Sequence, residues 1–302
     1  MPTSSDRQGV AFALAAYGAW GVAPVYFKWL DFANPTEVVA HRVVWSVVLL
    51  AVVIWLRGQW GAVRALERRQ LGWLALSGLL ISGNWVLYVW AIFNDRMLDA
   101  SLGYFINPLF NVLLGVVFFN EWMRPAQKLA LALAALGVGN EIVAVGVIPW
   151  VGLTLALSFG FYGVVRKRLS VGAAVGLGLE TTLVLPLALG YLAAVTFAGE
   201  GTLASGSPGQ IALLGLAGPV TVVPLVCFAA AAARLPLSVL GFFQYLAPST
   251  MFLLAVFVYG EPFRTSQLIT FGCIWFALAI FSGEALFHHR RLNRQLPHGG
   301  AA

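Results

Sequence analysis

Polar side chains recur inside long apolar stretches, and their spacing places several of them on one face of a helix. Tyr104, Asn107 and Asn111 follow one another at intervals of three and four residues, with Pro108 beside them. This spacing gives one helical face with amide donors and acceptors, and the proline leaves a backbone carbonyl free. Such a face could bind a small polar molecule or hydrogen-bond to neighbouring helices, and the sequence leaves both interpretations open.

Other apolar stretches carry similar faces. Asn84 and Tyr88 lie four residues apart, and Tyr17, Trp20 and Pro24 form a stripe in the first stretch. Polar groups in an apolar environment are costly, so they must face a cavity, a partner or one another. The candidate binding residues selected in this way are Tyr17, Trp20, Asn84, Tyr88, Tyr104, Asn107, Asn111, Tyr162, Gln244 and Tyr245.

Three ionisable residues also lie within apolar stretches. Arg42 is roughly 10 Å from the nearer predicted membrane boundary, at 1.5 Å per helical residue. We predict that it pairs with Glu180, the best intramembrane carboxylate; the alternative is that its planar fork binds an anionic group of a ligand. His41 could exchange protons near neutral pH, although a simple hydrogen-bonded role is favoured.

The remaining reactive residues do not form a recognisable catalytic or metal site. Cys227 and Cys273 lie in apolar runs, and the four His residues have no metal-ligand spacing with them. No glycine-rich phosphate loop with a lysine is present, so ATP is not the expected energy source. We therefore expect no enzyme activity, metal or cofactor, and the scattered basic clusters indicate no nucleic-acid partner.

Membrane-spanning helices must position these side chains. The chain has 302 residues, of which 60% are hydrophobic and 10% charged, and its mean hydropathy is +0.85. About 20 apolar residues cross the bilayer, so ten spans fit this length. The predicted fold is an all-α integral membrane protein with helices near Gly9–Leu30, Pro35–Leu56, Leu71–Phe93, Ala100–Phe119, Ala126–Val147, Trp150–Val165, Val171–Ala194, Ile211–Ala232, Val239–Tyr259 and Ser266–Phe287.

The distribution of basic residues predicts the orientation. With the N-terminus inside, 14 of the 18 Lys and Arg residues fall on the inner side, three on the outer side, and Arg42 within a span. Positive residues favour the cytoplasmic side. Both termini are therefore expected in the cytoplasm.

The chain contains a tandem duplication. Residues 108–127 align without gaps with residues 248–267, with seven of twenty positions identical, including Glu121/Glu261 and Gln127/Gln267. Because each copy has five spans, the second enters the membrane in the opposite orientation, which is typical of secondary transporters. We predict a first repeat over residues 1–148 and a second over 149–302 with a short cytoplasmic tail. Duplication kept only for folding is the alternative.

Several segments resemble one known family closely. They are AYGAWGVAPVYFK, EVVAHRVVWS, NWVLYVWA, ASLGYFINPLFNVLLG, SFGFYGVVRK, ETTLVLP and LGFFQYLAPSTMFLLAV. Together they are similar to the RarD branch of the EamA-type drug/metabolite transporter superfamily over nearly the whole chain. The resemblance implies a bacterial inner-membrane carrier with two EamA repeats, whose relatives export amino acids and other small metabolites. It does not identify the substrate.

These observations predict one site and leave some properties open. We expect a midplane cavity between the first, third and fourth spans and the sixth, eighth and ninth, suited to a small zwitterion or neutral amphiphile. Alternating-access export is the expected function, with a passive channel or structural membrane protein as the alternative. Proton coupling and oligomeric state are open. We further predict that Glu121 and Glu261 cap the helices that follow them and that Glu141 is exposed.

Overall fold

The protein is described here by a computed structural model that covers residues 4–169, 171–235, 239–240 and 243–295. The described residues form helices without any strand. The helices are α1 (Ser4–Lys28), α2 (Pro35–Leu56), α3 (Trp60–Arg64), α4 (Arg68–Phe93), α5 (Met97–Phe119), α6 (Pro125–Val145), α7 (Trp150–Leu169), α8 (Ala173–Phe197), α9 (Thr202–Ser205), α10 (Pro208–Gly215), α11 (Ala217–Ala232), α13 (Leu246–Leu253) and α14 (Thr265–Gln295), with a π-helical turn at Leu254–Val258.

Eight helical segments of the described chain are long and apolar enough to cross a membrane. They correspond to eight of the predicted spans, with α10 and α11 together forming one of them. The predicted sixth span coincides with α7, and the predicted ninth with the shorter apolar segment Leu246–Val258; neither is among the eight. Gly241 and Phe242 of that ninth span lie outside the described residues. The all-helical membrane fold is thus confirmed, whereas the count of ten spans stays a prediction.

Large apolar side chains cover the outside of the helices. Leu136, Val143, Leu187 and Phe276 are all mostly exposed, although each lies within a long apolar helix. A water-soluble protein rarely exposes a continuous apolar surface of this extent. These faces are suited to contact with lipid.

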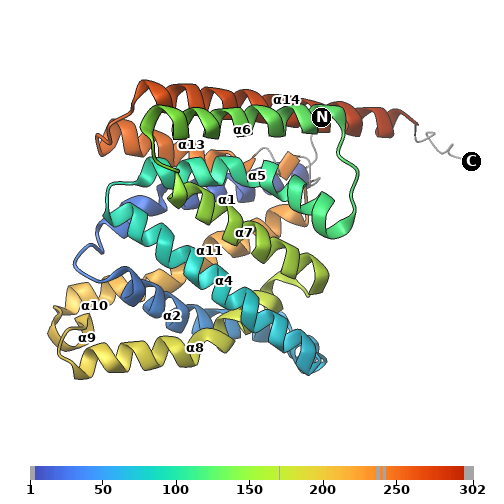
Figure 1. Ribbon diagram of the computed structural model, residues 1–302. Helices are drawn as coiled ribbons and strands as arrows, with labels where there is room; N and C mark the ends of the chain where they lie inside the picture. The colour runs from blue at the N-terminus through green and yellow to red at the C-terminus, as the bar shows by residue number, and fades with distance from the viewer. Residues whose placement is uncertain (1–3, 170, 236–238, 241–242, 296–302) are drawn as a thin grey trace, which may run out of the picture.

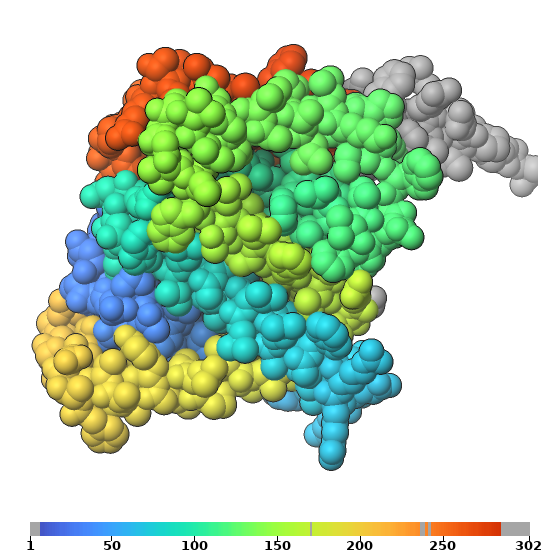
Figure 2. Space-filling view, viewed as in Figure 1, coloured from blue at the N-terminus to red at the C-terminus, as the bar shows by residue number. Residues whose placement is uncertain are grey.

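The first six helices interleave with the later ones. Figure 1 shows α6 and α14 side by side along one edge of the bundle and α2 with α8 along the other, with α1, α4, α5, α7 and α11 between them. Figure 2 shows the same two edges, with α6 in green and α8 in yellow. The main contacts, α6 with α14, α2 with α8, α5 with α7 and α1 with α11, each join a helix before Trp150 to one at or after it. Any cavity in the centre is therefore lined by both halves of the chain.

The aligned segments around Glu121 and Glu261 adopt the same turn. Asn120 and Gly260, which precede them, both have left-handed backbones, with φ of 54° and 65°. The amide of Glu121 donates to the carbonyl of Gly115, and that of Glu261 donates to the carbonyl at the aligned position 255. Gln127 and Gln267 each accept from the amide three residues earlier, at 2.9 Å, and so cap the following helix.

The two glutamate side chains differ in their contacts. Glu261 is buried and accepts hydrogen bonds from the amides of Met97 and Leu98, at 2.7 and 2.8 Å, at the beginning of α5. Glu121, after the end of α5, is exposed and pairs with Lys167. Burial raises the pKa of the Glu261 carboxyl, and the two amide hydrogen bonds oppose that shift. The prediction that both cap the following helices is wrong, because Glu261 caps α5 and the glutamines cap the following helices.

The predicted exposure of Glu141 is also wrong. Its residue is 7% exposed, and its carboxylate accepts a hydrogen bond from Thr270 at 3.2 Å. Close packing of α6 against α14 explains the burial, because Gly137 lies directly against Thr270 and Cys273. A helix end that is near the membrane surface can still be covered by a neighbouring helix.

Glycines set the closest approach between α5 and α7. A Cβ atom on Gly103 would lie 2.5 Å from the carbonyl oxygen of Gly152, and one on Gly152 would lie 2.8 Å from that of Asp99. Small residues allow this contact between membrane helices. The α5–α7 pair therefore depends on both glycines.

We predict that Gly103→Ala lowers the free energy of unfolding by about 1–3 kcal/mol, because the added methyl forces two backbones apart. Gly83→Ala is the matched control, since Gly83 is exposed on α4 with open space around it. Thermal unfolding in detergent should show a lower midpoint for Gly103→Ala alone. Equal midpoints for the two variants would contradict the close contact.

Candidate functional site

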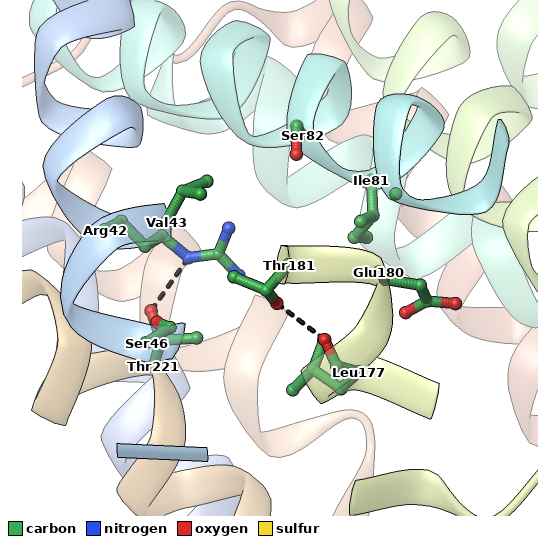
Figure 3. Close-up of a pocket in the computed structure, with 10 residues that line it drawn as sticks. Arg42, Val43, Ser46, Ile81, Ser82, Leu177, Glu180, Thr181 and Thr221 are labelled. Carbon is green, nitrogen blue, oxygen red and sulfur yellow. Dashed lines mark hydrogen bonds between the residues drawn. The ribbon is translucent and has the colours of Figure 1, made fainter. Parts of the chain in front are cut away.

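A narrow polar cavity lies between α2, α4, α8 and α11. Its lining consists of Arg42, Val43, Ser46, Gly78, Ile81, Ser82, Leu177, Glu180, Thr181 and Thr221, most of which are labelled in Figure 3. It has room for about one water molecule. The cavity is lined from four helices, two before Trp150 and two after it.

Arg42 is held firmly on one side of this cavity. Its Nε donates to Thr221 Oγ1 at 2.8 Å, and its guanidinium lies over the ring of Trp85 at 4.1 Å from the centroid. The residue is 7% exposed. Among the described residues no carboxylate lies within ion-pair distance of it. Its terminal nitrogens are therefore available to a ligand.

The predicted pair between Arg42 and Glu180 is wrong. The carboxylate of Glu180 accepts from Ser77 and, at 3.3 Å, from the hydroxyl of Tyr162. It also lies 3.5 Å from Nη1 of Arg166. Arg166 reaches it by crossing α8 at Gly176, where a Cβ atom would collide with the guanidinium.

One sequence feature marks a gap beside Glu180 without identifying its partner. Gly176 and Glu180 are four residues apart, so they share one face of α8. Arg166 lies beside Lys167 and Arg168 in the last turn of α7 and is one of the 14 basic residues counted on the inner side, a position that does not by itself indicate a contact within the membrane. A long arginine side chain can reach back along a neighbouring helix from the membrane boundary.

Aromatic residues extend from the cavity toward α5. Trp85 packs edge to face with Tyr88 at 5.4 Å, and Tyr88 with Tyr104 at 5.8 Å between ring centroids. Tyr88 also contacts Phe27 and donates to Met251 Sδ at 3.9 Å. The predicted residues Tyr88 and Tyr104 are thus joined to Arg42 through Trp85, which was not selected, and the predicted Tyr162 contacts Glu180 of the same cavity.

Asn84 and His41 have different environments. Asn84 Nδ2 donates to the carbonyl of Leu155 and to Ser158 Oγ, at 2.9 and 2.8 Å, so it joins α4 to α7. His41 is buried beside Arg42 on α2, and its Nε2 has no hydrogen-bond partner among the described residues. Asn84 fits the helix-joining role, and His41 keeps a free ring nitrogen.

The other candidates are dispersed. Tyr17 and Trp20 pack with Phe228 in a separate apolar cluster between α1 and α11. Asn107 is buried with its Oδ1 unpaired, whereas Asn111 is exposed. Gln244 and Tyr245 are half-buried in a turn before α13, not in a continuous helix. No group of three His, Cys, Asp or Glu side chains within the described part of the chain could hold a metal ion.

The sequence comparisons agree on one family. Residues 7–139 match the EamA-like transporter family. The chain is 50% identical to an "Uncharacterized transporter" of Vibrio cholerae, over 94% of this chain and 95% of the relative. It is 45% identical to "Protein RarD" of Escherichia coli, over 97% and 100%. It is 33% identical to "Chloramphenicol-sensitive protein RarD" of Pseudomonas aeruginosa, over 97% and 98%.

A solved structure described only as "Crystal structure of protein" has a similar fold. The TM-score is 0.59 at 18% identity, and the match covers 90% of this chain and 96% of the other. At this identity the likeness supports the arrangement of helices alone.

We predict that Arg166 and Glu180 are energetically coupled and that Arg42 and Glu180 are not. A double-mutant cycle with Arg166→Gln and Glu180→Gln should give a coupling of about 1–3 kcal/mol, as for contacting charged residues. The cycle with Arg42→Gln and Glu180→Gln should be additive within about 0.5 kcal/mol. Both couplings are measured from free energies of unfolding in detergent. If Arg42 and Glu180 are coupled and Arg166 and Glu180 are not, the pair predicted from the sequence is correct.

Proposed function

Because the chain belongs to the EamA-like transporter family together with the RarD proteins, we propose that it is a secondary transporter that exports a small amphipathic metabolite by alternating access. Amino acids and drug-like compounds are the substrate types considered. We further propose ten spans in two inverted repeats, residues 1–148 and 149–302, with both termini in the cytoplasm. Its setting is the bacterial inner membrane.

The pair of matching turns carries this proposal. The turns share their backbone hydrogen bonds and lie at opposite ends of α5, yet only Glu261 is buried against the other half of the chain. Two equivalent elements with different contacts are expected when one side of an inverted-repeat transporter is closed and the other is not. Exchange of those contacts would convert one state into the other.

The distribution of the apolar core supports the same assignment. The largest buried cluster of the described residues includes Phe27 from the end of α1 and Leu30 from the turn after it, Val38 from the beginning of α2, Ile92 from the end of α4 and Met97 from the beginning of α5. These helix ends meet where Glu261 binds α5, which we call the Met97 end. Tight packing there supports a state that is closed at that end.

The polar cavity at Arg42 is the candidate substrate site. It lies between both halves, so a relative movement of the halves would change its size and access. At present it admits about one water molecule. Substrate binding therefore requires α4 and α8 to separate, which is the type of movement that alternating access provides.

Counterflow in proteoliposomes tests the transport function. Vesicles loaded with an unlabelled amino acid or drug-like solute should accumulate the labelled solute transiently, and the rate should saturate. A pH gradient imposed in the same assay tests proton coupling, for which His41 is the candidate. Non-saturating flux without counterflow would indicate a passive channel instead.

We predict that Glu261→Gln shifts the protein toward the state open at the Met97 end. The neutral amide loses charge-assisted hydrogen bonds to two amides, each worth about 1.5–3 kcal/mol. A single cysteine placed at Ser101 on a background without Cys227 and Cys273 should react at least 5-fold faster with an impermeant maleimide from that side, since Ser101 is fully buried.

Glu121→Gln is the matched control for this prediction, because it makes the same change in the same turn at the other end of α5. It should not accelerate labelling of Ser101→Cys. If both substitutions accelerate it equally, the effect is general destabilisation, and the closing role of Glu261 is wrong.

A further inference from the structure

We propose that Arg42 binds a single carboxylate group and that the transported solute is a monoanion with an apolar body. This inference rests on the transport function proposed above and names the substrate class of the same cavity. It departs from the expectation of a zwitterion or neutral solute.

The guanidinium is fixed with one edge free. Thr221 accepts from Nε and Trp85 covers one face, so the plane of the group is set before any ligand arrives. Figure 3 shows the terminal nitrogens directed away from Thr221, into the space between Ser82 and Thr181. Two parallel N–H donors on a fixed plane match the two oxygens of a carboxylate.

A second buried group in the same cavity lacks a partner. Ser46 is 2% exposed, and its Oγ has no hydrogen-bond partner among the described residues. Buried hydroxyl groups are rarely left unpaired in folded proteins. Because Ser46 and Arg42 line the same cavity, a ligand that enters it can supply the acceptor that this hydroxyl lacks.

The cavity has no free acid to compete for Arg42 or to bind an ammonium group. Glu180 is the one carboxylate in the lining, and Ser77, Tyr162 and Arg166 already hold it. Arg42, Arg166 and Glu180 together leave one net positive charge. Since uncompensated charge within a membrane is costly, a bound monoanion balances the site, whereas a zwitterion leaves it positive.

The aromatic residues beside Arg42 suit an apolar body. Trp85 stacks under the guanidinium, and Tyr88 and Tyr104 continue the aromatic surface toward α5. Such a wall attached to one fixed polar group is typical of sites that bind amphipathic molecules. The body enters this region once α4 and α8 separate.

Binding of matched probes to the full chain in lipid nanodiscs tests the proposal. The probes are 3-phenylpropionate, its amide 3-phenylpropionamide, the zwitterion phenylalanine and chloride, measured by calorimetry. We expect the carboxylate to bind about 10- to 100-fold more tightly than the amide, which has the same body without the charge. Phenylalanine should bind more weakly than phenylpropionate.

Variants assign this preference to Arg42. Arg42→Gln should abolish the preference for carboxylate over amide, and Arg42→Lys should keep only part of it, because lysine lacks the planar fork. Arg124→Gln is the control. Arg124 is an exposed arginine at the beginning of α6, and it pairs with Glu284 on α14. If Arg42→Gln does not fold, Thr221→Val keeps the charge and should lower carboxylate affinity severalfold.

Three outcomes would overturn the proposal. They are equal binding of carboxylate and amide, tighter binding of phenylalanine than of phenylpropionate, and binding of chloride without any carboxylate. Counterflow separates the two levels of inference. If transport persists unchanged in Arg42→Gln, the carboxylate site is wrong and the transport function stands. If carboxylate binds but nothing is transported, the carboxylate site stands and the transport function is wrong.

Discussion

The cost of charge inside a bilayer is the constraint on which the centre of this protein depends. Arg42 and Glu180 both lie on membrane-spanning helices, and each must be compensated. Glu180 is compensated within the protein by a cation and two hydroxyl groups. Arg42 is compensated only in part, by one hydroxyl and one aromatic face. This difference makes Glu180 structural and leaves Arg42 available to a ligand.

Small residues make these contacts geometrically possible. Arg166 reaches Glu180 because Gly176 leaves a gap on α8, and α7 lies close to α5 because Gly103 and Gly152 face each other. In a membrane, helices gain little from apolar burial against one another, so close van der Waals contact and hydrogen bonds carry the packing. The same glycines therefore determine both the helix arrangement and the electrostatics of the cavity.

Sequence reasoning predicted the helices well and the tertiary partners poorly. Helix positions follow from local patterns, and eight predicted spans agree with the structure. Arg42 was identified because depth in a span can be counted along the chain. Its partner was not, because Thr221 and Trp85 lie on other helices and no local pattern reports which faces meet. Asn84 shows the same limit: its spacing reveals a polar face, but only the position of α7 distinguishes a helix contact from a binding site.

The two glutamate turns separate what local sequence determines from what conformation determines. Their shared residues produce the same backbone hydrogen bonds and the same glutamine caps, which are local interactions. The carboxylates differ because each depends on another helix: Glu261 accepts from two amides at the beginning of α5, whereas Glu121 pairs with Lys167 of α7. Under the exchange of conformations proposed above, only one of the two carboxylate contacts is made at a time, since making both together would close the cavity from both sides.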